Sequence, residues 1–199
     1  MGYRENLLNA IRRDSNHPIN CGVPMQVHHL LSKKGASNGG VKSILEAYGY
    51  DINELGNLVA LPCTLEGACH LEVQLHRGDH TSSSDDDDDE HPLSYHAHVS
   101  EIMSKAVDFI EKKCEKVSAE KVQSIMDKRS VDVLDDIKTF SIRLTRVHKS
   151  FKPEGKGCNR KSSIGELYSS LKLGNSNCDR DHKEFSNFPK KKYVLEVGK

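Results

Sequence analysis

The chain has 199 residues and a formal net charge of zero; 36% of its residues are hydrophobic, 6% are aromatic and none is Trp. This length suits one domain of ordinary size with extensions, and the hydrophobic fraction supports a modest core. There is no run of about 18 apolar residues, which excludes a membrane-spanning helix, and no N-terminal apolar stretch with a cleavage site, which argues against a signal peptide. We therefore expect a protein that is cytoplasmic when made, with any secretion following a route that needs no signal peptide.

Short helices, strands and loops are expected to alternate in the first half of the chain, judged by apolar spacing and by Gly, Pro and Asn content. In chain order these are a helix over 3–13, a loop over 14–24, an extended segment over 25–31, a polar loop over 33–40, a helix over 41–48 and a strand over 58–61. Residues 63–80 are predicted to enter a helix in which His76 and His80, four residues apart, share one face.

The second half begins with a low-complexity acidic stretch, residues 81–90, which we expect to be an exposed loop. Amphipathic helices are predicted over 98–114 and 119–149, the second either continuous or with a break near Ser130. From residue 151 the chain is polar and basic, and residues 143–199 contain 14 Lys and Arg against 6 Asp and Glu. We expect partial disorder in this tail and a terminal strand over 193–197. The tail is either a phosphate-binding arm or inert.

The six cysteines are scattered and form no C-x-x-C pair, so we interpret them as mostly reduced thiols. An alternative is a structural zinc site made by Cys63, Cys69, His70 and His76, although their spacing fits no common zinc pattern.

Two adjacent histidines, His28 and His29, are followed by Asn57 and then by His76 and His80. Imidazole has an ordinary pKa near 6.5, so it can act as a general base or as a neutral metal ligand around neutral pH. A His pair, an Asn and a second His pair in this order can build a divalent-metal nuclease site. Taken singly, each has a simpler explanation: packing beside leucines, a turn residue, or surface histidines on a helix.

Four segments carry a family resemblance. They are HHLLSKKGA at 28–36, ILEAYGYDINELGNLVALP at 44–62, LHRGDH at 75–80 and SYHAHV at 94–99. Together, over about residues 25–105, they resemble the AHH group of the HNH/endonuclease VII nuclease superfamily. The resemblance implies an α+β fold with a ββα-metal core surrounded by helices and a largely helical C-terminal half.

The activity implied by the resemblance is that of a metal-dependent endonuclease that hydrolyses phosphodiester bonds, with DNA favoured and little sequence preference. Members of the group often occur as toxin domains of bacterial effectors, including type VI-secreted ones. This implies an antibacterial toxin with a cognate immunity protein as partner. The cofactor would be one divalent ion, and imidazole ligands favour Zn, Ni or Mn over Mg.

Site roles follow from the same resemblance. His29 would be the general base that deprotonates water, and Asn57 would hold the loop and orient this base by a hydrogen bond. His28, His76 and His80 would bind the metal ion. Arg77 would contact the scissile phosphate.

Two departures from the family pattern matter. Val27 replaces the Ala that precedes the His pair, which changes packing but not chemistry. The acidic stretch separates LHRGDH from SYHAHV, so the last metal ligand is either His80 or His91. His80 is preferred because of its spacing from His76. His96 fits the family's Tyr-His and has no assigned role.

The expected organisation is an N-terminal helix or leader at 1–24, a nuclease core at 25–115, a helical extension at 116–150 and a tail at 151–199. Two other functions stay open. One is a non-enzymatic zinc-binding module that recruits a partner. The other is an interaction protein with a degenerate nuclease fold, for which the acidic insertion is the motivating observation.

Overall fold

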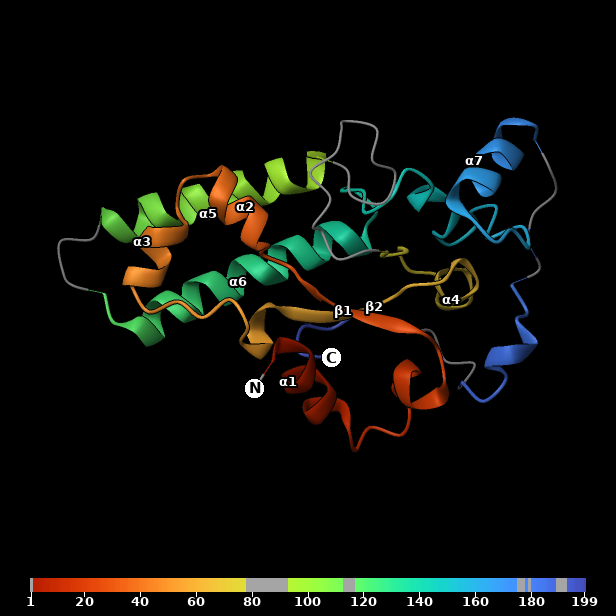
Figure 1. Ribbon diagram of the computed structural model, residues 1–199, viewed down its shortest axis with the longest axis horizontal. Helices are drawn as coiled ribbons and strands as arrows, with labels where there is room; N and C mark the ends of the chain where they lie inside the picture. The colour runs from red at the N-terminus through yellow and green to blue at the C-terminus, as the bar shows by residue number, and fades with distance from the viewer. Residues whose placement is uncertain (1, 78–92, 113–116, 175–177, 179, 189–192) are drawn as a thin grey trace.

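The computed structural model describes residues 2–77, 93–112, 117–174, 178, 180–188 and 193–199 (Figure 1). Its elements, in chain order, are α1 Tyr3–Ile11, η1 Pro18–Cys21, β1 Met25–His29, α2 Lys33–Asn38, α3 Lys42–Ala47, η2 Leu55–Asn57, β2 Leu58–Pro62, α4 Leu65–Leu71, α5 Leu93–Glu111, α6 Ala119–Lys138, η3 His148–Ser150, α7 Ile164–Lys172 and η4 Lys183–Phe185. The fold is α+β with the order β1, β2, α4, and this ββα unit is surrounded by helices, as the sequence predicts.

The two strands pair in antiparallel fashion, with His28 opposite Val59 and His29 opposite Leu58. Every residue of β2 is buried, because both of its faces are covered. Side chains alternate along a strand. Leu58 and Ala60 pack against α1, while Val59 and Leu61 belong to the main core on the other face.

The long helices α5 and α6 lie side by side, α2 packs against α5, and α3 contacts α2 (Figure 1). The apolar faces predicted for the two long helices are buried, including Val99 and Met103 of α5 and Val122 and Met126 of α6. Helix α2 approaches α5 closely because Gly35 has no side chain: a Cβ there would lie 2.6 Å from Val99 Cγ1.

A second hydrophobic cluster joins the C-terminal segment to α4. It contains residues of both parts of the chain: Leu65, Ala68, Cys69, Leu75, Val147, Phe151, Cys158, Ile164 and Leu167. The described part of the tail, where the sequence predicts partial disorder, therefore contains a packed helix, α7. No described residue of 193–197 is in a strand, but Gly198 donates its N–H to Leu58 O and Lys199 O accepts from Ala60 N, so the final residues run along β2.

Three sequence-based predictions of helices and loops are wrong. Residues 33–40, expected to be a loop, contain α2, whose N-terminus is capped by the Ser32 hydroxyl accepting from Gly35 N. Helix α6 has no break at Ser130 and ends at Lys138, not near residue 149. Phe140 takes a left-handed conformation, and the Gln74 amide donates to the carbonyl of Ile137 at this helix end.

The third error concerns residues 63–80. Helix α4 ends at Leu71, where Glu72 adopts a left-handed conformation with φ of 55°. His76 therefore lies in an irregular segment beyond the helix, and its N–H donates to Pro62 O at 2.9 Å. The prediction that His76 lies in a helix is therefore wrong, and His80 lies outside the described residues. None of the described helices is long and apolar enough to cross a membrane.

Candidate active site

His28 and His76 face each other in the interior beside the ββα unit. Nδ1 of His28 lies 3.0 Å from Nε2 of His76, and both side chains are almost fully buried. On its other side, Nε2 of His28 lies 2.7 Å from the hydroxyl of Tyr95 on α5. The three rings therefore form a buried cluster drawn from β1, the segment after α4, and α5.

The hydrogen bonds of Tyr95 determine the tautomer of His28. The Tyr95 hydroxyl donates its proton to Leu30 O at 2.7 Å, so it accepts from His28 Nε2–H. Nδ1 of His28 then carries the lone pair, and this lone pair points toward His76. Burial raises the pKa of the Tyr95 phenol, which keeps its proton in place.

This donor set fits a metal ion. Two nitrogens that each lie about 2.1 Å from one ion are roughly 3.0–3.4 Å apart when the angle at the ion is between about 90° and 109°. The separation of 3.0 Å between His28 and His76 agrees with that range. A histidine ligand whose other nitrogen is fixed by a hydrogen bond is the usual arrangement around bound metals. His28 and His76 can therefore supply two of the ligands.

His29 faces the opposite side of β1, as expected for neighbouring residues in a strand. Its Nε2 lies 3.1 Å from Asn53 Oδ1, and its ring packs on Tyr3 with centroids 4.3 Å apart. Since Asn53 Oδ1 accepts from Nε2–H, the lone pair of His29 is on Nδ1. Burial lowers the pKa of His29, the hydrogen bond that His29 donates to Asn53 raises it by less, and the nearby Lys33 also lowers it. His29 is thus a neutral, half-buried imidazole at neutral pH.

Asn57 does not make the hydrogen bond to His29 that was predicted for it. It is fully buried, and its Oδ1 accepts from Leu31 N at 2.6 Å and from the Ser130 hydroxyl at 2.9 Å. Its Nδ2 donates to the carbonyls of Leu31 and Ile52. These four bonds use the full capacity of the amide. Asn57 therefore joins the end of β1 to α6, and Asn53 takes the position beside His29.

His96 is buried next to Tyr95. Its Nδ1 lies 3.0 Å from the Ser32 hydroxyl, which in turn caps α2. Arg77 is half-buried and follows His76 directly. His80 and His91, the two candidates for the last ligand, lie outside the described residues, as does the acidic stretch at 81–90.

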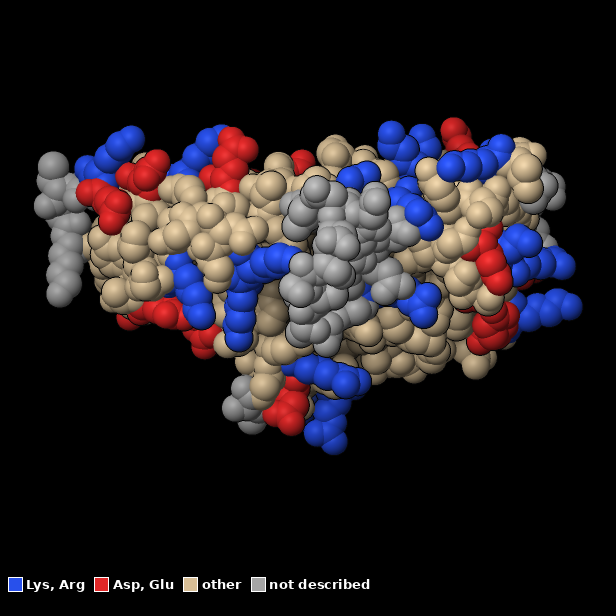
Figure 2. All heavy atoms as spheres, turned by 45° about the horizontal axis from the view of Figure 1, so that its top comes forward, with Lys and Arg blue, Asp and Glu red and all other residues tan. Residues whose placement is uncertain are grey.

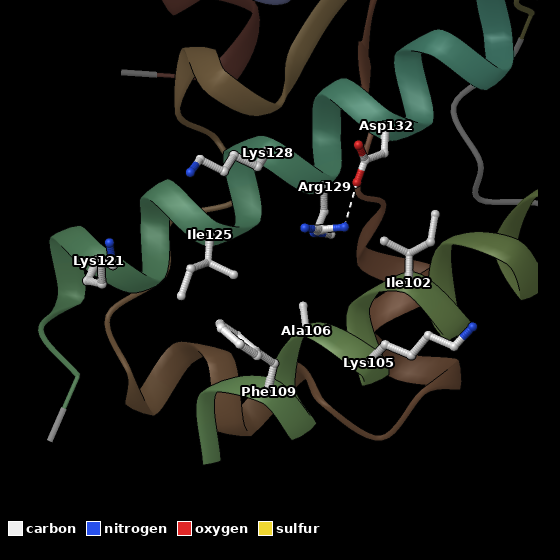
Figure 3. A pocket seen from close by; sticks show the side chains of 9 residues that line it. All are labelled: Ile102, Lys105, Ala106, Phe109, Lys121, Ile125, Lys128, Arg129 and Asp132. Atoms are coloured by element: carbon white, nitrogen blue, oxygen red, sulfur yellow. Dashed lines mark hydrogen bonds and ion pairs between the residues drawn. The ribbon is translucent and has the colours of Figure 1, made fainter. Parts of the chain in front are cut away.

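The structure has two pockets that bear on the candidate site. One pocket, lined in part by Lys33, Lys42 and Asn53, borders the residue that contacts His29. Another, between α5 and α6, has Phe109 and Ile125 at its centre and a basic rim that includes Lys105 (Figure 3). Among the described residues, no histidine of the site lines the second pocket. Figure 2 shows Lys and Arg side chains at several places on the visible face, interspersed with Asp and Glu.

Sequence reasoning missed the roles of Tyr95 and Asn53. Both residues are within the segments that carry the resemblance, SYHAHV and ILEAYGYDINELGNLVALP. Tyr95 contacts His28 across 67 residues of sequence, and Asn53 contacts His29 across 24. Sequence spacing does not predict contacts over such separations. A tyrosine immediately before a histidine was the one available signal.

The ββα order with paired histidines is the arrangement expected of the HNH-like nuclease class. A family model described as a nuclease family of the HNH/ENDO VII superfamily with conserved AHH matches residues 13–139. This match covers more than half of the chain, and the chain belongs to the AHH nuclease family. Comparison with curated proteins and comparison with solved structures each find no match.

Proposed function

We propose that this nuclease is a metal-dependent endonuclease that hydrolyses phosphodiester bonds of DNA. The observation that carries the proposal is the buried pair His28 and His76, held at 3.0 Å with the lone pair of His28 directed at its partner by Tyr95. A bound divalent ion would polarise a phosphate oxygen and stabilise the leaving oxygen.

In this proposal the chain's residues divide the work. His28 and His76 hold the ion, and the third protein ligand is His80 or His91. His29, whose side chain lies on the opposite side of β1 from His28, is the general base in this proposal and takes the proton from a water that reaches its own side of the strand. Burial keeps its imidazole neutral, and Asn53 holds Nε2 so that Nδ1 can accept. Arg77, next to His76 in the chain, contacts the scissile phosphate through charge-assisted hydrogen bonds.

The substrate is proposed to approach over the pocket that contains Lys33 and Lys42. These two cations line the same pocket as Asn53, so a phosphate backbone there would pass near His29. Contacts of this kind bind the backbone and carry no base information, which predicts little sequence preference. The preference for DNA over RNA rests on the family resemblance.

The biological role that we propose is an antibacterial toxin effector that acts in the cytoplasm of a target cell. It rests on the resemblance to toxin domains and implies a cognate immunity protein in the producing cell. The organisation proposed is a nuclease core over 25–115, preceded by a leader and followed by a helical extension and a C-terminal tail.

The test is cleavage of supercoiled plasmid by the purified chain with Mn, Ni, Zn or Mg, and after chelation. Nicking that requires metal and is lost in His28→Ala, His76→Ala and His29→Ala supports the proposal. His98→Gln is the matched control. This half-exposed histidine on α5 pairs with Asp136, and the proposal assigns it neither to the metal ligands nor to the general base. His80→Ala and His91→Ala, compared side by side, identify the third ligand.

A non-enzymatic zinc-binding module or a degenerate nuclease fold predicts a different result. Either would bind metal without cleaving plasmid DNA, single-stranded DNA or RNA under any of these conditions. For the toxin role, expression in a bacterial host should arrest growth and fragment the chromosome, and His29→Ala should relieve both effects. Growth arrest that persists in His29→Ala would count against nuclease toxicity.

A further inference from the structure

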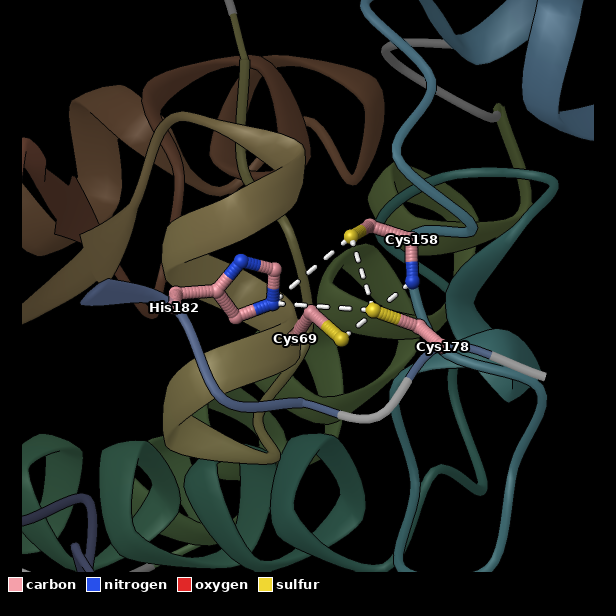
Figure 4. Close-up of side chains that lie close together, drawn as sticks. All are labelled: Cys69, Cys158, Cys178 and His182. Atoms are coloured by element: carbon pink, nitrogen blue, oxygen red, sulfur yellow. Dashed lines mark hydrogen bonds between the residues drawn. The ribbon is translucent and has the colours of Figure 1, made fainter. Parts of the chain in front are cut away.

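Four potential metal ligands meet at a second place, where α4 packs against the C-terminal segment. Cys69 is on α4, Cys158 follows η3, and Cys178 and His182 follow α7 (Figure 4). Their ligand atoms all lie within 4.8 Å of one another. We propose that these four side chains form a structural zinc site, separate from the candidate active site.

The distances among Cys158, Cys178 and His182 agree with tetrahedral zinc. The Sγ atoms of Cys158 and Cys178 are 3.6 Å apart, and they lie 3.7 and 3.9 Å from Nε2 of His182. With zinc–sulfur bonds of about 2.3 Å and zinc–nitrogen bonds of about 2.0–2.1 Å, a tetrahedron has sulfur–sulfur separations of about 3.8 Å and sulfur–nitrogen separations of about 3.6 Å. A disulfide requires sulfur atoms about 2.05 Å apart, much closer than those of Cys158 and Cys178.

The loop that carries Gly157 and Cys158 approaches the cysteine side chains of the cluster closely. Gly157 has a positive φ of 69°, and a Cβ there would lie 2.7 Å from Cys178 Cβ and 2.9 Å from Cys69 Sγ. The absence of a side chain lets the loop approach the sulfur atoms, and the next residue, Cys158, directs its N–H to Cys69 Sγ at 3.2 Å. Such N–H donors stabilise thiolates that bind metals.

Arg180, between the last two ligands, holds the surrounding segments together. Its guanidinium donates to the carbonyls of Cys69 on α4 and of Lys152 and Gly155 in the loop before Cys158. It also pairs with Glu72 at the end of α4, with 3.5 Å between Nη1 and Oε1. These bonds bring the ligand-bearing segments together at one point.

Burial and composition suit a structural ion. Cys69 and Cys158 are fully buried and His182 is 8% exposed. Four protein ligands leave no open position for water or substrate, which is the pattern of structural zinc and not of catalytic zinc. The cluster adjoins a small hydrophobic core of nine buried residues, the kind of core that metals commonly stabilise. Three ligands lie beyond residue 139, where the family match ends, so the site is an addition to the nuclease unit.

The test uses the whole chain and reads metal binding directly. In the His28→Ala/His76→Ala double variant, which lacks the proposed nuclease ligands, the purified protein should still retain about one zinc per chain. Replacement by Co²⁺ should give visible d–d bands and near-ultraviolet thiolate-to-cobalt charge transfer. The charge-transfer bands should disappear in Cys158→Ser and persist in Cys63→Ser, the matched control, since Cys63 lies outside the cluster.

A measurement on the unmutated chain guards against a variant that fails to fold. Mass-spectrometric mapping of alkylation should find Cys69, Cys158 and Cys178 protected with zinc bound and reactive after chelation, while Cys63 reacts alike in both states. Equal reactivity of the three cysteines with and without zinc, cobalt spectra lacking thiolate bands, or a Cys158–Cys178 disulfide under reducing purification would each overturn the proposal. These readouts do not depend on DNA cleavage.

Discussion

The hydroxyl of Tyr95 joins His28 to the backbone directly after β1: it accepts from His28 Nε2 at 2.7 Å and donates to Leu30 O at 2.7 Å. One side chain from α5 thus fixes both the ring orientation and the tautomer of a residue 67 positions earlier.

Tyr95→Phe should weaken metal binding by roughly 10–100-fold, because the His28 N–H loses its acceptor and the tautomer with its lone pair toward His76 is no longer favoured. The measurement is plasmid cleavage as a function of metal concentration. Tyr193→Phe is the control, since the buried hydroxyl of Tyr193 makes no hydrogen bond among the described residues. Equal metal dependence in the two variants would contradict the role given to Tyr95.

Substitutions of Asn53 and Asn57 should have different effects, one mainly on DNA cleavage and the other mainly on the stability of the fold. Asn57→Ala should lower the free energy of unfolding by about 2–6 kcal/mol, because Leu31 N and the Ser130 hydroxyl lose a buried acceptor at about 1–3 kcal/mol each. Asn53→Ala should leave urea unfolding nearly unchanged but reduce cleavage roughly tenfold.

The pH profile tests Asn53 further. Cleavage should fall as pH drops through the pKa of His29, which burial lowers from its ordinary value, since the protonated ring cannot accept a proton. Because the Asn53 hydrogen bond raises this pKa, Asn53→Ala should move the acid limb of the profile to lower pH. An unshifted limb would mean that Asn53 does not act through His29.

Gly35→Ala should destabilise the fold by about 1–3 kcal/mol, because the new methyl group would overlap Val99 and force α2 away from α5. Val99→Ala in the same chain should recover part of this loss. Gly165→Ala in α7 is the control: only the Arg146 guanidinium comes as near as 4.0 Å, so the change should be neutral or stabilising by up to about 1 kcal/mol. Urea unfolding measures all three variants.

Stability should decline in mild acid. Burial lowers the pKa of His17 and of His148 in the folded chain, so protons bind the unfolded chain more tightly. The stabilisation is present above the ordinary pKa near 6.5 and is lost as pH falls through the lowered values. His17→Asn, which keeps an acceptor for Ile19 N, should reduce this pH dependence in urea titrations. Stability that rises on acidification would contradict the prediction.

Lys42→Ala should weaken DNA binding and reduce the slope of log affinity against log salt by about 1, as expected for one lost phosphate contact. Lys105→Ala, on the rim of the pocket between α5 and α6, is the matched control (Figure 3). If Lys105→Ala changes the slope and Lys42→Ala does not, the DNA path runs over α5 and α6 instead.

Sequence patterns predicted the parts of the fold that have local signals. The strands around His28 and Leu58 and the apolar faces of α5 and α6 follow from short-range periodicity. Helix α2 was missed because Gly35 within it and Gly39 and Gly40 directly after it disfavour a helix; the close approach of α2 to Val99 explains Gly35. The end of α6 depends on Gln74, a residue 63 positions from Ile137.

The candidate site was only partly predictable for the same reason. The family resemblance gave the order of histidines, but it could not assign Asn53 and Asn57 their separate hydrogen bonds. The sequence alternative of zinc at Cys63, Cys69, His70 and His76 shares only Cys69 with the cluster that the structure brings together. The other members of that cluster come from distant segments of the chain. Their spacing in the sequence therefore does not predict that they lie close together.

The hydrogen bonds of Gly198 and Lys199 to β2 have a consequence for self-association. An unpaired strand edge is a template on which another chain can add. β1 lies along one side of β2, and the final residues bond to Leu58 O and Ala60 N. Another molecule would have to displace Gly198 and Lys199 before it could extend the sheet at β2. These residues therefore protect this edge of β2 against edge-to-edge aggregation.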